Sequence, residues 1–184
     1  MANAQEQYVA TAIAAFGQDD WQRVLDALPV PVYTTDPEGA VTYWNQACVD
    51  FAGRLPQLGS DRWCVTWQLY TTTGEFLPHE QCPMAEAVKS KREVRDKVAI
   101  ALRPDGTRRA FRAYPTPLFD QDGSFTGAAN LLLDISDEQV EALTDQAARC
   151  RRLSRSTLDP EASAILSNMA SDYDETAKSL KAPA

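Results

Sequence analysis

The stretch Val30-Pro-Val-Tyr-Thr-Thr-Asp-Pro-Glu-Gly-Ala-Val-Thr-Tyr-Trp-Asn45 decides how the chain begins to fold. β-Branched and aromatic residues dominate 30–35 and 40–44, and between them Pro37 fixes φ and Gly39 tolerates positive φ. This pattern predicts a β-hairpin. Asn45 then precedes a helical pattern over 46–52, and we expect it to act as the N-cap, because its side-chain oxygen can accept a backbone N–H of the first turn.

Length, charge and hydropathy limit the classes of function. The 184 residues are enough for one main hydrophobic core with helical extensions. A formal charge of −8 and a pI near 4.7 argue against binding to nucleic acid or to an acidic membrane, because phosphate would repel the chain. No apolar run approaches the roughly 20 residues needed to cross a bilayer, and the N-terminal residues lack the basic start of a signal peptide. We therefore expect a cytoplasmic protein.

Further strands and helices follow from the pattern of the rest of the chain. Residues 67–70 form a brief strand pattern, and Pro83 in the first turn favours a helix over 82–88. Turn sequences at 104–106 and 120–123 separate three longer strand patterns, over 98–102, 108–114 and 125–135. After Ser136 the apolar spacing becomes three and four, and Asp159-Pro160-Glu161 starts a second helix. The short link between these two helices predicts an antiparallel helical hairpin.

This order of elements resembles the PAS family. The residues that carry the resemblance are Val24-Leu-Asp-Ala-Leu-Pro29, Asn45-Gln-Ala47, Leu77-Pro-His-Glu-Gln-Cys-Pro-Met-Ala85, Arg103-Pro-Asp-Gly-Thr107 and Asn130-Leu-Leu-Leu-Asp-Ile-Ser136, within residues 20–138. The resemblance implies an α+β PAS fold, with a five-stranded antiparallel sheet and helices over one face. On this reading, 1–18 is an N-terminal amphipathic helix, 19–136 the PAS domain and 137–184 a C-terminal helical hairpin.

A ligand pocket commonly lies between the sheet and the helices of PAS domains, and strand alternation suggests its lining. Tyr33 and Thr35 on the first strand, and Asn130 and Leu132 on the last, are expected to face inward. Further polar groups could come from Tyr43, Trp67, Arg112 and Tyr114. The alternative is that all of these side chains fill a dry core, with their polar tips at its rim.

His79, the only histidine, is the residue that most invites a chemical role. His79-Glu80 resembles the phosphoacceptor pair of sensor kinases, but Pro78 places it in a broken loop rather than in a long helix. Haem-carrying PAS domains take an axial ligand from this region, so haem through His79 remains an alternative to a structural loop role. Cys64 lacks the surrounding motif of the flavin-binding branch. The four cysteines have no CxxC spacing, so we expect neither a zinc site nor a redox dithiol. Because the flavin motif is missing and haem would depend on His79 alone, we expect no bound cofactor.

No Ser/His/Asp set, carboxylate pair or phosphate loop can be assembled, so we expect no enzyme activity. The prediction is a non-catalytic PAS sensor and protein-interaction module of bacterial signal transduction, acting through a partner such as a histidine kinase. The alternatives are a sensor that holds haem or a metabolite in the PAS pocket, and an enzyme of unrecognised type. We also expect a homodimer through apolar stripes outside the sheet, formed by Tyr8, Ile13 and Phe16 and by Val140, Leu143 and Ala147.

Overall fold

The structure, a computed structural model, describes residues 7–8, 11–12, 14 and 20–181. The strands are β1 (Val32–Thr35), β2 (Val41–Trp44), β3 (Gln68–Tyr70), β4 (Phe76–Leu77), β5 (Lys97–Leu102), β6 (Arg108–Phe119) and β7 (Phe125–Asp134). The helices are α2 (Trp21–Asp26), α3 (Gln46–Ala52), the 3₁₀ turn η1 (His79–Gln81), α4 (Pro83–Ser90), α5 (Ser136–Ser156) and α6 (Pro160–Lys181). No helix among the described residues is both long and apolar enough to cross a membrane.

The strands form one antiparallel sheet in the order β2-β1-β7-β6-β5-β3-β4. The predicted fold class is confirmed, but the sheet has seven strands in the described chain rather than five. The two additional strands are β3, which lies within the brief strand predicted over 67–70, and β4. They form a short hairpin that pairs with β5 through Leu69 and Ala101. Prolines and glycines interrupt this part of the sequence, so its strands are too short to give a clear alternation.

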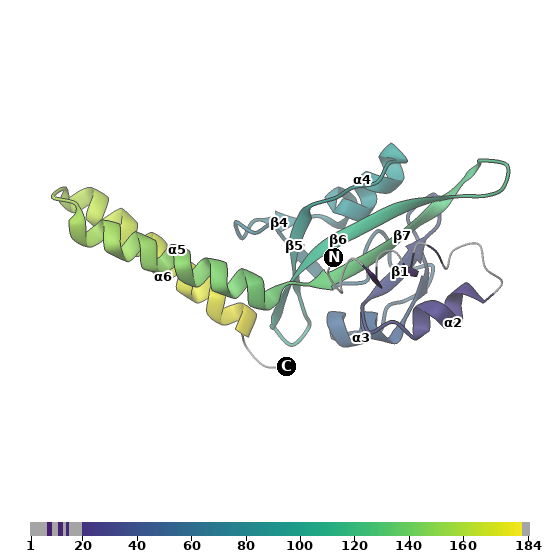
Figure 1. Cartoon of the computed structure of the whole chain (residues 1–184), viewed down its shortest axis with the longest axis horizontal. Helices are drawn as coiled ribbons and strands as arrows, with labels where there is room; N and C mark the ends of the chain where they lie inside the picture. Colours follow the sequence, from purple (N-terminus) through teal and green to yellow (C-terminus); the bar gives the residue numbers. More distant parts are fainter. Residues whose placement is uncertain (1–6, 9–10, 13, 15–19, 182–184) are drawn as a thin grey trace.

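Both faces of the sheet are covered, whereas the sequence predicted helices over one face. The inner face packs against α3 and α4, and Phe51 of α3 meets Phe111 of β6 edge to face with ring centroids 5.7 Å apart. The outer face of β1, β2 and β7 packs against α2 and against Tyr8 and Ala12. The outer face of β5 and β6 packs against the base of α5 and α6, which project from the sheet as a rod (Figure 1).

A bulge in the first hairpin decides which residues of β2 face inward. Tyr33 pairs with Trp44 and Thr34 with Tyr43, but Thr35 pairs with Val41, so Thr42 is the additional residue. Val41 therefore joins the inner core while Tyr43, two residues later, lies on the outer face. Simple alternation would have placed both side chains on the same face.

Asn45 holds the start of the fold together. Its Oδ1 accepts the backbone N–H of Val32 at 3.0 Å, and its Nδ2 donates to the carbonyls of Leu25 and Val30, both at 2.9 Å. Asn45 occupies the N-cap position of α3, as predicted, but its side chain makes no capping hydrogen bond. The expected capping role of the side chain is therefore wrong, because the buried amide is used to join α2, β1 and β2 instead.

We predict that Asn45→Ala destabilises the protein by about 2–4 kcal/mol, because the Val32 N–H and the Leu25 and Val30 carbonyls lose their hydrogen bonds to the side chain. The measurement is urea unfolding followed by circular dichroism. Gln46→Ala is the matched control, since Gln46 is exposed and bonds only to Asp50 on the helix surface. An Asn45→Ala variant as stable as Gln46→Ala would contradict the proposed role.

Candidate functional site

Three groups from distant parts of the chain meet on the inner face of the sheet. The fully buried Tyr33 hydroxyl donates to the carbonyl of Trp63 at 3.0 Å and accepts from Nδ2 of Asn130 at 3.0 Å. Oδ1 of Asn130 in turn accepts the backbone N–H of Tyr114 at 3.1 Å. Burial raises the pKa of Tyr33 well above its ordinary value, so the hydroxyl keeps its proton and remains a donor. A continuous polar path thus links the 53–66 segment to the centre of the sheet.

Trp63 connects this core network to the surface. Its φ of 68° lies in the left-handed region, which for a bulky residue costs of order 1–3 kcal/mol and is typical of functional sites. The backbone N–H of Trp63 donates to the carbonyl of Gly39 at 2.7 Å, and its ring lies directly over that glycine. A Cβ at Gly39 would lie 2.2 Å from the ring, so only glycine fits beneath it. Arg62 and Lys89 both lie over the ring, 5.6 and 5.4 Å from its centroid.

Buried thiols surround the same network. Sγ of Cys64 lies 3.1 Å from the hydroxyl of Thr66, and Cys82 directs its Sγ toward the Trp63 carbonyl at 3.7 Å. Burial raises the pKa of Cys64 and raises that of Cys82 to about 12, so both remain thiols at neutral pH. All four cysteines are buried and free. Thiols in this state are weak nucleophiles, and they contribute mainly packing and weak hydrogen bonds.

The structure divides the predicted pocket residues into two groups. Four of them lie on the inner face: Tyr33, Thr35, Asn130 and Leu132. The other four do not line this core, which corrects the prediction. Tyr43 and Tyr114 pack on the outer face, Arg112 faces Glu138 of α5 at 3.7 Å, and Trp67 is 48 % exposed. The bulge in β2 explains the outward position of Tyr43. Pairing with Leu133 and Leu131 of the outer cluster places Arg112 and Tyr114 on the outer face.

Two buried polar atoms of the inner face lack partners among the described residues. These atoms are Oγ1 of Thr35 and Nε1 of Trp44. The threonine hydroxyl can both donate and accept a hydrogen bond, whereas the tryptophan N–H can only donate one. A buried polar atom without a hydrogen bond is costly, and such atoms often mark a position where a ligand or water binds. Trp44 and Trp63 were absent from the predicted lining. Trp44 could have been found, since it lies opposite Tyr33 in the hairpin register, but no local signal reveals the conformation of Trp63.

His79 lies beside the core rather than in it. Two surface cavities of about 490 and 460 Å³ share Trp67, His79 and Glu80, and the first also touches Trp63 and Thr66. Nε2 of His79 is buried and has no hydrogen-bond partner among the described residues. Burial lowers the pKa of His79 below 6.5, the nearby Asp61 opposes this shift, and Arg54 adds to it. His79 is therefore neutral at physiological pH.

The residues around His79 do not fit a haem held inside the PAS core. Fully buried side chains, among them Tyr33, Met84 and Phe111, pack on the inner face where such a group would lie. One of the two cavities next to His79 is lined instead by Arg54 and Asp61, whose side chains pair at 2.8 Å, and the other lies over Phe76 and Gln68. Among the described residues, no cluster of three or more potential ligands is placed to hold a metal ion.

The predicted interface residues of α5 are used within the chain. Val140 and Leu143 pack with Ala177 and Leu180 of α6, and Ala147 packs with Ala170. Tyr8 packs on the outer face of the sheet, while Ile13 and Phe16 lie outside the described residues. The exposed apolar side chains of the helical hairpin are instead Leu153, Leu158, Ile165 and Met169.

The fold was compared with known proteins. A family model described as "PAS fold" matches residues 25–140. The LOV protein of Rhodobacter sphaeroides shares 13 % identity with a TM-score of 0.50, over 94 % of this chain and 98 % of that one. The PAS domain of BvgS from Bordetella pertussis shares 22 % identity with a TM-score of 0.44, over 67 % and 91 %.

A third structure, an RNA-binding light-oxygen-voltage receptor, shares 19 % identity with a TM-score of 0.46 and covers 61 % of this chain. The chain spans only 31 % of that receptor. No curated protein matches the sequence. At 13 % identity the Rhodobacter sphaeroides structure supports the fold alone.

We predict that Tyr33→Phe lowers the free energy of unfolding by about 1–3 kcal/mol, because the Trp63 carbonyl loses the hydroxyl that donates to it and Asn130 loses an acceptor. Urea unfolding measures the change. Tyr70→Phe is the matched control, since its hydroxyl bonds only to Gln68 near the surface and its loss should stay within about 0.5 kcal/mol. Equal effects of the two substitutions would show that the Tyr33 network adds no stability.

Titration of His79 should make the protein less stable as the pH falls. The pKa of His79 is lower in the folded protein than in the unfolded chain, so the unfolded chain binds the proton first as the pH falls. The free energy of unfolding is therefore highest above about pH 6.5 and decreases as the pH falls through the folded pKa. His79→Gln should remove this part of the pH dependence. Urea unfolding at about pH 7.5 and 5.5 measures it in both proteins. Since the chain has one histidine, the difference between them isolates His79, and parallel profiles would exclude the effect.

Proposed function

The chain belongs to the PAS family, a family of sensor domains, and from this premise we propose that it is a non-catalytic sensor and protein-interaction module of bacterial signal transduction. It would work in the cytoplasm and act through a protein partner such as a histidine kinase. In this proposal the Tyr33–Asn130–Trp63 network is the sensing core, and the α5–α6 hairpin is the output element.

The observation that carries the proposal is the hydrogen-bonded joint between β7 and α5. The backbone N–H of Ile135 donates to the carbonyl of Ala110, and the Ala110 N–H donates to Oγ of Ser136, both across to β6. Asp134 caps the joint through the Ser136 N–H at 2.9 Å. Asn130, four residues before Asp134, lies in the same strand and bonds into the core. A change at Asn130 that shifts β7 would therefore be transmitted to α5.

The output surface is the distal patch, which we define as Leu153, Ile165 and Met169. These side chains are 49, 54 and 39 % exposed. Helical periodicity places Ile165 and Met169 on one face of α6, and the Ser154–Ser163 and Ser154–Ser167 hydrogen bonds set Leu153 of α5 beside this part of α6. A helical partner could bury the patch, either the dimerisation helices of a kinase or a second copy of this chain.

A second candidate is a small-molecule sensor with its ligand on the inner face of the sheet. The unpaired Oγ1 of Thr35 and Nε1 of Trp44 favour it, because a polar ligand or a ligand with bound water would satisfy both atoms. Visible spectroscopy and native mass spectrometry of the purified protein test this candidate. A molecule that is bound by the purified protein and lost from the Thr35→Val variant would favour the small-molecule sensor over an interaction module that needs no ligand.

We predict that Met169→Glu weakens association with the partner at least about tenfold, because a charge would be buried in the contact. Light scattering measures self-association, and a pull-down with candidate histidine kinases measures the heterologous contact. Ser171→Glu is the matched control, since Ser171 lies two residues away on another side of α6. A protein that stays monomeric at high concentration and captures no kinase would overturn the proposed output surface.

A further inference from the structure

A row of three arginines runs along α5 at the end of the hairpin that projects away from the sheet (Figure 1). These residues, Arg149, Arg152 and Arg155, are all exposed, and we call them the arginine row. Their guanidinium groups form no ion pair within the described part of the chain, whereas Arg151 between them pairs with Asp174 of α6. The row is therefore a set of three free positive charges at the far end of the rod.

The charge of this segment is opposite to that of the rest of the chain. Residues 146–158 hold four arginines and no aspartate or glutamate. The 18 basic and 26 acidic residues of the whole chain give −8, so without these four arginines the remainder carries −12. An acidic partner is therefore repelled by most of the protein and attracted by the arginine row.

Helix stability alone does not account for the arginine row. Arg152 and Arg155 lie close to the C-terminus of α5 at Ser156, where the helix dipole favours a positive charge. Arg149 lies about two turns before that end, where the dipole has little effect, and it repels Arg152 as an i, i+3 neighbour. Like charges in such a row lower the stability of an isolated helix, and a negatively charged partner would remove the repulsion.

Exposed apolar side chains lie beside the arginine row. Leu153 of the distal patch follows Arg149 by four residues, so the two side chains are neighbours on the surface of α5. Leu158, in the turn between α5 and α6, is 100 % exposed. The carbon stems of the arginines add further apolar surface around these leucines. The end of the hairpin thus combines positive charge with carbon surface that has no cover within the described chain.

This combination indicates a protein partner rather than a nucleic acid or a lipid surface. A phosphate backbone has no apolar groups to cover Leu158 or the distal patch. The headgroups of an anionic membrane would meet Asp159 and Glu161, which lie next to Leu158 and are exposed. A protein helix can present an apolar stripe and carboxylates side by side, and thus matches both features.

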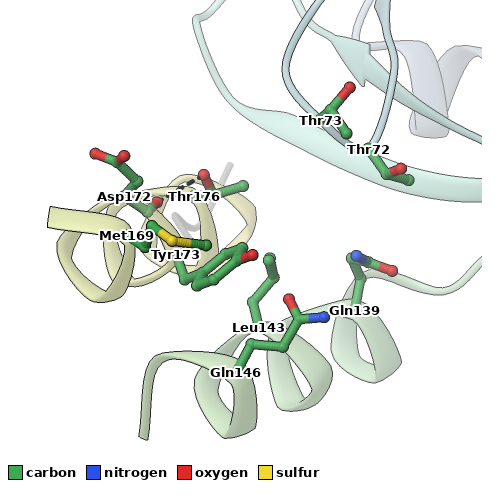
Figure 2. A pocket seen from close by; sticks show the side chains of 9 residues that line it. All are labelled: Thr72, Thr73, Gln139, Leu143, Gln146, Met169, Asp172, Tyr173 and Thr176. Carbon is green, nitrogen blue, oxygen red and sulfur yellow. Dashed lines mark hydrogen bonds between the residues drawn. The ribbon is translucent and has the colours of Figure 1, made fainter. Parts of the chain in front are cut away.

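The surroundings of the hairpin determine where a partner helix fits. Nearer the sheet, the turn between β3 and β4 lies beside the hairpin, and Thr73 of this turn lines one hollow together with Gln139 and Leu143 of α5 (Figure 2). On α6 the carboxylate of Asp172 points outward, away from Leu143 (Figure 2). Glu161, also on α6, is exposed as well. The distal half of the hairpin is therefore the accessible part, and acidic residues of a partner fit over α5 rather than over α6.

We propose that the distal patch and the arginine row together bind an acidic amphipathic helix of a partner protein. The apolar stripe of that helix covers Leu153, Ile165 and Met169, and carboxylates along its flank pair with the arginine row. Burial of the apolar side chains supplies affinity, and the charge pairs select the partner and fix its orientation. The inference rests on the proposed function of the distal patch and adds the chemistry of the partner.

The test is fluorescence anisotropy of the full chain with labelled helical peptides that share one leucine stripe and differ only in the flanking residues, which are glutamate, glutamine or lysine. We expect the glutamate peptide to bind with a dissociation constant below about 100 µM, the glutamine peptide at least about tenfold more weakly, and the lysine peptide more weakly still. Affinity for the glutamate peptide should fall as salt is added, because the arginine row is exposed. Equal affinity for the glutamate and glutamine peptides, or no binding of the glutamate peptide at about 1 mM, would overturn the proposal.

A triple substitution locates the site. Arg149→Gln/Arg152→Gln/Arg155→Gln should weaken binding of the glutamate peptide at least about tenfold, because all three free charges of the row are removed. Urea unfolding should give this variant the same midpoint as the parent protein. A lower midpoint together with unchanged peptide binding would assign the arginine row a purely structural role and overturn the proposal.

The matched control makes the same change of charge at three other exposed positions, in Arg23→Gln/Arg92→Gln/Lys178→Gln. Binding of the glutamate peptide should stay within about twofold of the parent protein in this variant, because none of these side chains lies at the far end of the hairpin. Circular dichroism checks that both triple variants fold. Equal loss of binding in the two variants would assign the binding to net charge and overturn the site.

Two further probes separate an acidic helix from other acidic partners. They are a single-stranded polyuridine RNA and vesicles of phosphatidylcholine and phosphatidylserine in equal parts. We expect both to bind the full chain more weakly than the glutamate peptide does. Tighter binding of either probe that is lost in the arginine-row variant would overturn the proposal in favour of that class of partner.

Failure of this inference and failure of the proposed function are distinguishable. If a partner depends on Met169 but the glutamate peptide does not bind, the output surface stands and the acidic helix falls. If the glutamate peptide binds through the arginine row but Met169→Glu has no effect on any association, the arginine row stands as a binding site and the proposed output surface falls.

Discussion

The side-chain amide of Asn45 is the interaction that organises the start of the fold. A single side chain binds the end of α2, the entry to β1 and the first residues of β1, and it does so at the point where β2 becomes α3. Backbone groups that enter a core must find partners, and Asn45 supplies one to each of these three, although the Leu25 carbonyl also accepts the N–H of Leu28 at 3.1 Å. Asn45 therefore fixes the hairpin against the helix that precedes it.

The turn of the first hairpin also positions Trp63, which links the Tyr33 network of the core to the surface. Gly39 lies in its turn, and the turn needs a positive φ, here 88°. Position 39 requires glycine for a second reason, because the ring of Trp63 occupies the space that a side chain would fill. With the ring held there, the strained backbone of Trp63 points its carbonyl at Tyr33, and Tyr33 bonds to Asn130. One turn thus positions a surface tryptophan and, through it, a polar group on the central strand β7.

Much of the fold could be predicted from local sequence signals. The Val30–Asn45 hairpin, the helix over 46–52, the three longer strands and the two C-terminal helices each have a strong period or a clear boundary residue, such as Pro160. Strand alternation also placed Tyr33, Thr35, Asn130 and Leu132 on the inner face. These features depend on neighbours within a few residues, which is the range over which propensity and periodicity act.

Only the tertiary structure decided the rest, because the deciding contacts join residues far apart in sequence. The bulge at Thr42 places Tyr43 on the outer face, and pairing with Leu133 of β7 places Arg112 on that face, beside Glu138 of α5. The positive φ of Trp63 depends on Gly39 and Tyr33 together, and the stripe of Val140 and Leu143 is buried only because α6 folds back on it. Local sequence patterns identify most of the elements and their order, apart from the short β4. The packing of those elements determined which side chains are free to act, since burial is a property of the assembled layers and not of any one segment.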